Sequence, residues 1–182
     1  MRVLIVDDES LIRMDLRDII ESCGHEVVAE GTNGVEAIKL CKEYKPDIVL
    51  MDVKMPELDG IEAARQIGFH HEAPVVLLTS YSQQDLINKA RESGVYGYLL
   101  KPVREEQLVP TLEMALGRYH SDAQLREKMA ELEQSLEDRK IIQKGTGILM
   151  DLYSISEEEA YNRIRALSMK KRDSIVNICK AL

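Results

Sequence analysis

Short apolar runs alternate with helical stretches along the first 118 of the 182 residues. The runs at 3–6, 48–51 and 75–78 are continuously apolar, which is typical of parallel strands covered by helices on both faces. Two further strands are predicted at 27–30 and 96–100. Helices are predicted at about 9–22, 34–44, 59–68, 83–93 and from 104 onward. Five strands alternating with five helices predict an α/β fold with a doubly wound parallel sheet.

The fifth predicted helix continues beyond this domain, because no proline follows Pro110 up to residue 142. Four apolar residues recur along it at spacings of 4, 3 and 4. They are Leu125, Met129, Leu132 and Leu136. This spacing is an a/d seam of about two heptads, and we predict a parallel dimerising coiled coil. The alternative is an amphipathic helix that packs on its own domain.

Three short helices are predicted near the C-terminus, at about 139–152, 156–168 and 171–181. Ser156 is followed three residues later by Glu159, the pattern of a capping box at a helix start. These helices predict a small all-α three-helix bundle. The chain is therefore divided into a domain at 1–118, a coiled-coil linker at 119–138 and a helical module at 139–182.

Charge is spread unevenly along the chain, whose net charge is −8. Residues 139–182 hold nine Lys/Arg and five Asp/Glu, a net charge of +4, so the remainder carries −12. This reversal suggests two modules with different partners. The negative total argues against nonspecific nucleic-acid binding by the whole molecule.

No apolar run approaches the ~20 residues that span a bilayer. The apolar stretch at 3–6 is also too short for a signal peptide. We therefore expect a cytoplasmic protein that does not associate with membranes.

Polar residues follow four of the predicted strands, where each strand ends. They are Asp7 and Asp8 after the first, Asp52 after the third, Thr79 and Ser80 after the fourth, and Lys101 after the fifth. In an open α/β sheet, ligands bind beyond the carboxyl ends of the strands. The sequence therefore predicts that these side chains form one site.

The chemistry of this set fits a hard cation beside a phosphoryl acceptor. Clustered carboxylates repel one another, and Mg²⁺ would relieve that repulsion through one or two direct oxygen ligands. Asp52 is a candidate nucleophile that would form an acyl phosphate. The Lys101 ammonium would stabilise charge on the transferred oxygens, and the Thr79 hydroxyl offers them a hydrogen bond.

Four segments, at 3–9, 47–56, 77–80 and 97–102, resemble the motifs of the receiver domain of two-component response regulators. They read VLIVDDE, DIVLMDVKMP, LLTS and GYLLKP. The resemblance implies a flavodoxin-like sheet with strand order 2-1-3-4-5 and phosphorylation of Asp52 by a sensor histidine kinase. It implies no enzyme beyond the receiver's own Mg²⁺-dependent phosphotransfer and dephosphorylation.

The same resemblance assigns the metal ligands. Asp8 and Asp52 would bind Mg²⁺ directly, the backbone carbonyl of Lys54 would be a third protein ligand, and Asp7 would act largely through water.

The resemblance also assigns a switch. Thr79 would move toward the phosphoryl group and Tyr98 would turn inward. Without the resemblance, we would interpret Tyr98 as a half-buried packing residue. Lys101-Pro102 would be a cis peptide bond, and Ser80 would keep the phosphoryl site open.

The C-terminal module resembles the ANTAR domain, an RNA-binding module of transcription antiterminators, including those of ethanolamine utilisation. The likeness rests on residues 139–142, 147–150, 156–161 and 164–165. Members of the family usually have alanine near Gly145 and lysine near Thr146, and we expect Lys144 to compensate for the absent lysine.

The excess of positive charge in this module suits contact with phosphates. RNA loops are read by stacking on aromatic or Arg planes and by hydrogen bonds to bases. Tyr161 and Arg165 are four residues apart and share a helix face. The RNA-binding candidates are Arg139, Lys140, Lys144, Gly147, Tyr161 and Arg165. The alternative for the basic residues is a solvated surface.

Together these features predict a phosphorylation-controlled regulator. Phosphorylation of Asp52 would favour a homodimer, whose two modules would bind paired RNA hairpins in a leader transcript and prevent transcription termination. One alternative is a DNA-binding transcription factor. Duplex DNA is not expected as a partner, because the last helix is too apolar to lie in a groove. The other alternative is a regulator whose output module binds proteins.

Overall fold

The computed structural model describes residues 1–70, 72–80 and 94–182. The helix predicted at 83–93 therefore lies outside the described residues. The chain forms two compact units, a sheet unit at 1–122 and a helical unit at 123–182. Within the described residues, no helix is long and apolar enough to cross a membrane.

The sheet unit is built on five parallel strands in the order β2-β1-β3-β4-β5. The strands are β1 (Arg2–Val6), β2 (Glu26–Gly31), β3 (Ile48–Asp52), β4 (Val75–Thr79) and β5 (Val95–Leu100). All five predicted strands are present within one or two residues of their expected ends. The predicted flavodoxin-like fold with strand order 2-1-3-4-5 is confirmed.

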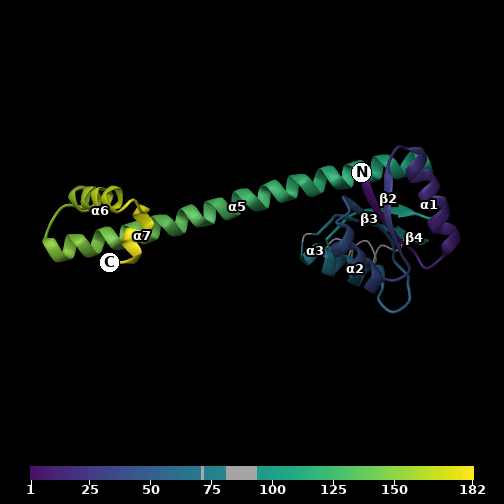
Figure 1. Ribbon diagram of the computed structural model, residues 1–182, viewed down its shortest axis with the longest axis horizontal. Coiled ribbons are helices and arrows are strands. Elements are labelled where there is room, and N and C mark those ends of the chain that lie inside the picture. Colours follow the sequence, from purple (N-terminus) through teal and green to yellow (C-terminus); the bar gives the residue numbers. More distant parts are fainter. Residues whose placement is uncertain (71, 81–93) are drawn as a thin grey trace. The chain divides into compact units, whose positions relative to one another are not determined.

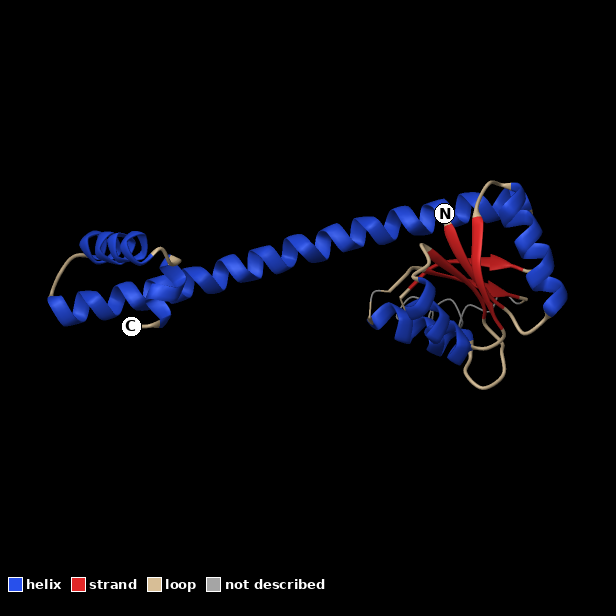
Figure 2. Ribbon diagram, viewed as in Figure 1, coloured by secondary structure: helices blue, strands red, loops and turns tan. Residues whose placement is uncertain are grey.

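Helices cover both faces of the sheet (Figures 1 and 2). They are α1 (Ser10–Ser22) and the start of α5 on one face, and α2 (Gly34–Tyr44) and α3 (Gly60–Phe69) on the other. A hydrophobic core lies on each face of the sheet, and alternate β1 residues pack into one core or the other. Ile5 packs on the α1 side and Leu4 on the α2 side. This two-sided burial explains why the central strands are apolar at consecutive positions.

The helix α5 (Glu105–Tyr153) is longer than the sequence predicts. A separate helix at 139–152 was expected, and this prediction is wrong because α5 continues through Gly145 and Gly147 without a break. Gly145 has a packing role instead. A Cβ added there would lie 2.8 Å from the Cys179 sulfur and 2.7 Å from its Cβ. The missing side chain therefore lets the C-terminal helix approach α5 closely.

Two shorter helices, α6 (Glu157–Lys171) and α7 (Ile175–Lys180), complete the helical unit. The third helix was predicted at 171–181, and it is shorter because α6 ends at Lys171. Ile164, Ile178 and Cys179 form the buried core of the unit.

The predicted capping box at the start of α6 forms only in part. The Ser156 hydroxyl accepts a hydrogen bond from the Glu159 backbone N–H at 3.3 Å. The Glu159 carboxylate pairs with Arg163 at 3.0 Å rather than reaching back to Ser156. Four residues separate Glu159 from Arg163, so they are neighbours on the helix surface.

Candidate functional site

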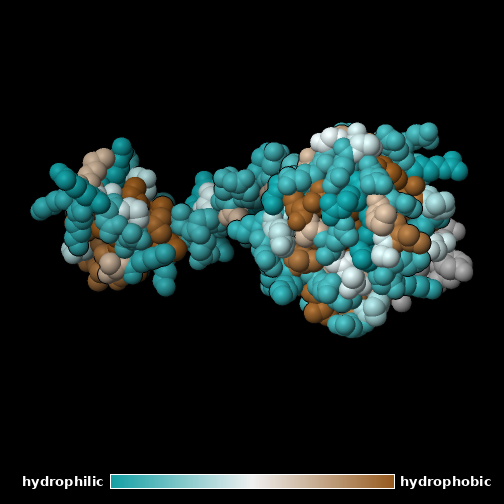
Figure 3. Space-filling model, turned by 45° about the vertical axis from the view of Figure 1, so that its right-hand side comes forward, coloured by the Kyte–Doolittle hydropathy of each residue, from teal (hydrophilic) through white to brown (hydrophobic). Residues whose placement is uncertain are grey.

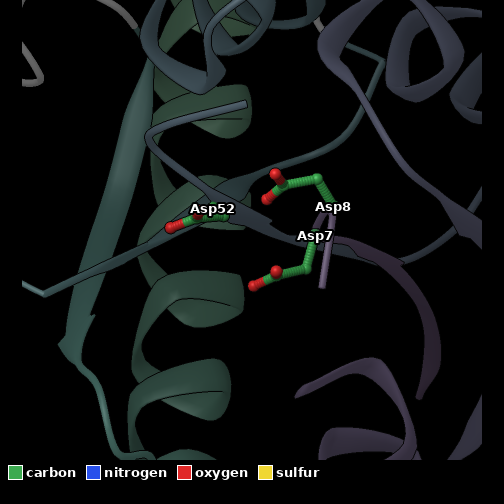
Figure 4. Close-up of side chains that lie close together, drawn as sticks. All are labelled: Asp7, Asp8 and Asp52. Carbon is green, nitrogen blue, oxygen red and sulfur yellow. The ribbon is translucent and has the colours of Figure 1, made fainter. Parts of the chain in front are cut away.

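Three carboxylates meet at the carboxyl ends of β1 and β3 (Figure 4). One oxygen each from Asp7, Asp8 and Asp52 can be chosen so that all three lie within 4.8 Å of one another. Asp7 and Asp52 are buried, whereas Asp8 is exposed. The adjacency of β1 and β3 produces this cluster, because parallel neighbours end at the same edge of the sheet.

Lys101 follows the end of β5 and contacts two of the three carboxylates. Its ammonium lies 2.7 Å from Asp7 Oδ2 and 3.2 Å from Asp52 Oδ1. Burial alone would lower the pKa of Lys101, but its bonds to Asp7 and Asp52 outweigh burial and raise the pKa above its ordinary value. Lys101 therefore keeps its positive charge throughout the physiological range.

The carboxyl group of Asp52 experiences opposing influences. Burial raises its pKa above the ordinary value of a carboxyl, Lys101 opposes the increase, and the charge of Asp7 adds to it. Ionisation of Asp52 is therefore less favourable in the folded chain than in the unfolded chain. A cation at the cluster would favour the ionised form that nucleophilic attack requires.

A pH-dependent stability difference follows from the raised pKa of Asp52. As pH rises through the unfolded and then the folded pKa of this group, the native chain should lose stability relative to Asp52→Asn. We expect a higher Tm for Asp52→Asn at neutral pH without Mg²⁺, and a vanishing difference in acid. Thermal unfolding at several pH values checks this. The matched control is Asp18→Asn on the exposed surface of α1, and an equal Tm gain there would contradict the explanation.

Gly60 allows the first turn of α3 to lie against the backbone of Asp52. Its N–H donates to the Val53 carbonyl at 2.9 Å, and an added Cβ would clash with the Asp52 carbonyl oxygen. The structure shows that Gly60 supports the loop that follows Asp52.

Replacement of Gly60 by alanine should therefore destabilise the fold by about 1–3 kcal/mol, the usual range for overpacking. Urea unfolding measures the change. Gly117→Ala is the control, since its Cβ would meet open space inside α5. That substitution should be neutral or stabilise by up to ~1 kcal/mol. Equal effects of the two substitutions would refute the close-approach argument.

Arg13 supports the acidic turn, a role that no sequence pattern indicates. Its Nη1 donates to the Asp7 carbonyl at 2.7 Å, and its Nε donates to Glu30 at 3.1 Å. Arg17 binds the same Glu30 carboxylate, with 2.6 Å between Nη2 and Oε1. These contacts tie α1 and β2 to the point where the chain leaves β1.

The remaining predicted receiver residues lie around the same edge. The Lys101 N–H donates to the Thr79 carbonyl at 2.9 Å, so these two residues are adjacent. Ser80 is exposed, and Lys101-Pro102 is cis as expected. Tyr98 is 51% exposed on β5. Lys54 lies in the exposed loop two residues after Asp52.

A divalent cation fits the acidic cluster. Asp7 Oδ2 is buried and, apart from its ion pair with Lys101, accepts no hydrogen bond from the described residues. Three carboxylates within reach of one ion, one of them exposed to solvent, match the oxygen ligands and retained waters that Mg²⁺ prefers.

In the helical unit, the predicted seam is exposed. Leu125, Met129, Leu132 and Leu136 are each at least 59% exposed. Figure 3 shows hydrophobic surface on this unit as well as on the sheet unit.

The structure brings together some of the RNA-binding candidates. Arg139 and Tyr161 line one groove between α5 and α6. Lys144 and Arg165 are exposed on separate helices, and Lys140 pairs with Glu137 at 3.6 Å. Gly147 lies on α5 with open space where a Cβ would be.

Family comparisons agree with this architecture. The model of the response regulator receiver domain matches residues 3–113, and the model of the ANTAR domain matches residues 130–182. The chain therefore belongs to the response regulators in which a receiver domain is followed by an ANTAR domain. This architecture is that of a response regulator with an RNA-binding output.

Individual relatives cover either the whole chain or the receiver domain. The transcriptional regulatory protein PdtaR of Mycobacterium tuberculosis is 39% identical over 181 residues, covering 100% of this chain and 88% of that protein. The chemotaxis protein CheY of Thermotoga maritima is 42% identical over 112 residues, covering 61% of this chain and 93% of CheY. The crystal structure of a receiver domain from a Desulfovibrio desulfuricans diguanylate cyclase aligns with a TM-score of 0.61 and 33% identity, covering 66% and 96% of the two chains.

Proposed function

We propose that this protein takes a phosphoryl group on Asp52 from a sensor histidine kinase in the cytoplasm. The observation that carries the proposal is the cluster of Asp7, Asp8 and Asp52 in contact with Lys101. Asp8, Asp52 and the Lys54 carbonyl would hold Mg²⁺, with Asp7 acting through water. When bound, the ion neutralises charge on the transferred oxygens.

The chain's own groups supply the remaining chemistry. An Asp52 carboxylate oxygen attacks phosphorus, which forms the acyl phosphate as the bond to the kinase histidine breaks. The Lys101 ammonium stabilises the negative charge that develops on the phosphoryl oxygens. The Thr79 hydroxyl then donates a hydrogen bond to one of these oxygens, and Tyr98 turns inward in response. Its exposed starting position is consistent with such a movement.

We further propose that phosphorylation favours a parallel dimer. Its seam would be the exposed apolar stripe of Leu125, Met129, Leu132 and Leu136, in a linker at 119–138 between the receiver domain at 1–118 and the module at 139–182. When a second copy covers exposed apolar side chains at coiled-coil spacing, their removal from water lowers the free energy of the dimer. The dimer would present two basic modules to paired RNA hairpins in a leader transcript and prevent transcription termination.

Binding assays with RNA hairpins and duplex DNA at several salt concentrations test this output. We expect hairpin binding that weakens as salt rises, because phosphate contacts release counterions, and weaker binding to the duplex. Preferential binding to the duplex would favour a DNA-binding factor. Failure to bind either nucleic acid would favour a protein-binding output.

A further inference from the structure

The loop at 53–59 carries the chain from the end of β3 to the start of α3. Its first residue, Val53, is held through both of its backbone polar groups. The Val53 N–H donates to the Leu78 carbonyl of β4 at 3.0 Å, and the Val53 carbonyl accepts from the Gly60 N–H at 2.9 Å. The next residue, Lys54, is exposed. Its position therefore depends on Val53 and on how the far end of the loop is held.

The far end of the loop is held by a different helix. Gly34, the first residue of α2, donates its N–H to the Leu58 carbonyl at 3.1 Å. The Leu58 N–H in turn donates to the Pro56 carbonyl at 2.8 Å, which closes a three-residue turn. Glu57 at the centre of this turn has a φ of 64°, in the left-handed region that residues other than glycine rarely adopt. Such a conformation persists only where its surroundings hold it, and Gly34 supplies one of the contacts that do so.

Only glycine permits this close contact between α2 and the loop. Gly34 is buried, and a Cβ added there would lie 2.5 Å from the Leu58 carbonyl oxygen and 3.0 Å from the Leu58 Cβ. It would also lie 3.0 Å from the Cβ of Ala63 on α3. A backbone oxygen cannot rotate away as the end of a flexible side chain can. Any larger residue at this position must therefore displace Leu58 together with its turn, or displace the start of α2.

We propose that Gly34 is a positioning residue for the metal site, an inference that rests on the proposed Mg²⁺-dependent phosphorylation of Asp52. By holding Leu58, Gly34 fixes the loop that supplies the Lys54 carbonyl as a ligand. Mg²⁺ demands near-ideal octahedral geometry, so displacement of one ligand weakens binding even when the carboxylates stay in place. Gly34 does not touch the ion and acts only through Leu58 and its turn.

The test is a titration of the isotope-labelled full chain with Mg²⁺, followed through the amide resonances in NMR spectra. The same spectra report whether each variant is folded, so Mg²⁺ affinity is compared between folded chains only. Gly34→Ala should bind Mg²⁺ about tenfold more weakly than the native chain, the lower range for loss of a group that orients a metal ligand. Leu58→Gly is a second variant, which loosens the turn from the loop itself and should also weaken Mg²⁺ binding.

Ala37→Gly is the matched control, because Ala37 is fully buried in the next turn of α2. Glycine weakens the helix there but adds no atom against Leu58, so stability should fall while Mg²⁺ affinity stays native. Native Mg²⁺ affinity in folded Gly34→Ala, or in Leu58→Gly if Gly34→Ala does not fold, overturns the positioning role and leaves the metal site standing. An equal loss of affinity in Ala37→Gly does the same. A native chain whose resonances do not respond to Mg²⁺ overturns both the positioning role and the metal site.

Discussion

Replacing Asp52 by asparagine is expected to reduce phosphorylation of the chain to background. The asparagine amide has nearly the same shape as the carboxylate but is not a nucleophile toward phosphorus. The measurement is the intact mass of the full chain after incubation with acetyl phosphate and Mg²⁺. The native chain should gain the mass of one phosphoryl group, and Asp52→Asn should gain none.

Asp18→Asn is the control for this experiment, since Asp18 is an exposed acid on α1. It should be phosphorylated like the native chain. Phosphorylation of the Asp52→Asn chain at the native rate would mean that Asp7 or Asp8 accepts the group. The role assigned to Asp52 would then be wrong.

The second large effect is expected at the apolar seam of α5. Leu132→Glu places two like charges in the centre of the proposed dimer, where they would lose solvation and repel each other. The activated chain should then remain monomeric. Its affinity for a transcript with two hairpins should fall by at least about 100-fold, the lower range of the gain from two linked binding sites.

Ala130→Glu adds the same charge at an exposed position beside the seam and serves as its control. It should dimerise and bind the double hairpin like the native chain. Light scattering after gel filtration gives the oligomeric state, and a hairpin titration gives the affinity. A Leu132→Glu chain that still dimerises and still binds the double hairpin tightly would exclude the seam as the interface.

Hydrophobic patterning predicted the sheet well because the strands are buried on both faces. Ile48, Val49 and Leu50 are all fully buried, so every position in that run is apolar for a physical reason. The same reasoning failed in the helical unit. The helix predicted as separate at 139–152 is the last part of α5. Glycine ordinarily weakens a helix, and no sequence pattern indicated that Gly145 packs against the distant Cys179.

The acidic site was predictable because strand ends place residues at a common edge with little help from loops. Asp7, Asp52 and Lys101 each follow an apolar run, and their contacts follow from the strand order. The support from Arg13 was not predictable, since an arginine on an exposed helix pattern usually points to water. Arg13 lies on α1 and its partner Glu30 lies on β2, so only the fold reveals the contact.

The groove between α5 and α6 shows a further limit of sequence patterns. Glu157 and Glu158 look like ordinary acids in the first turn of a helix, where the helix dipole favours negative charge. Only the packing of α6 beside α5 makes them line one groove together with Arg139 and Gln143.

The coupling between Asp52 and RNA binding is tested most directly by one titration. Hairpin RNA is titrated with the native chain and with Asp52→Asn, each with and without beryllofluoride and Mg²⁺, while sedimentation reports the size of the complex. We predict that beryllofluoride increases RNA affinity and shifts the native chain from monomer to dimer, and that it changes neither property in Asp52→Asn. Equal RNA affinity and equal size of the native chain with and without beryllofluoride would contradict phosphorylation control of this protein.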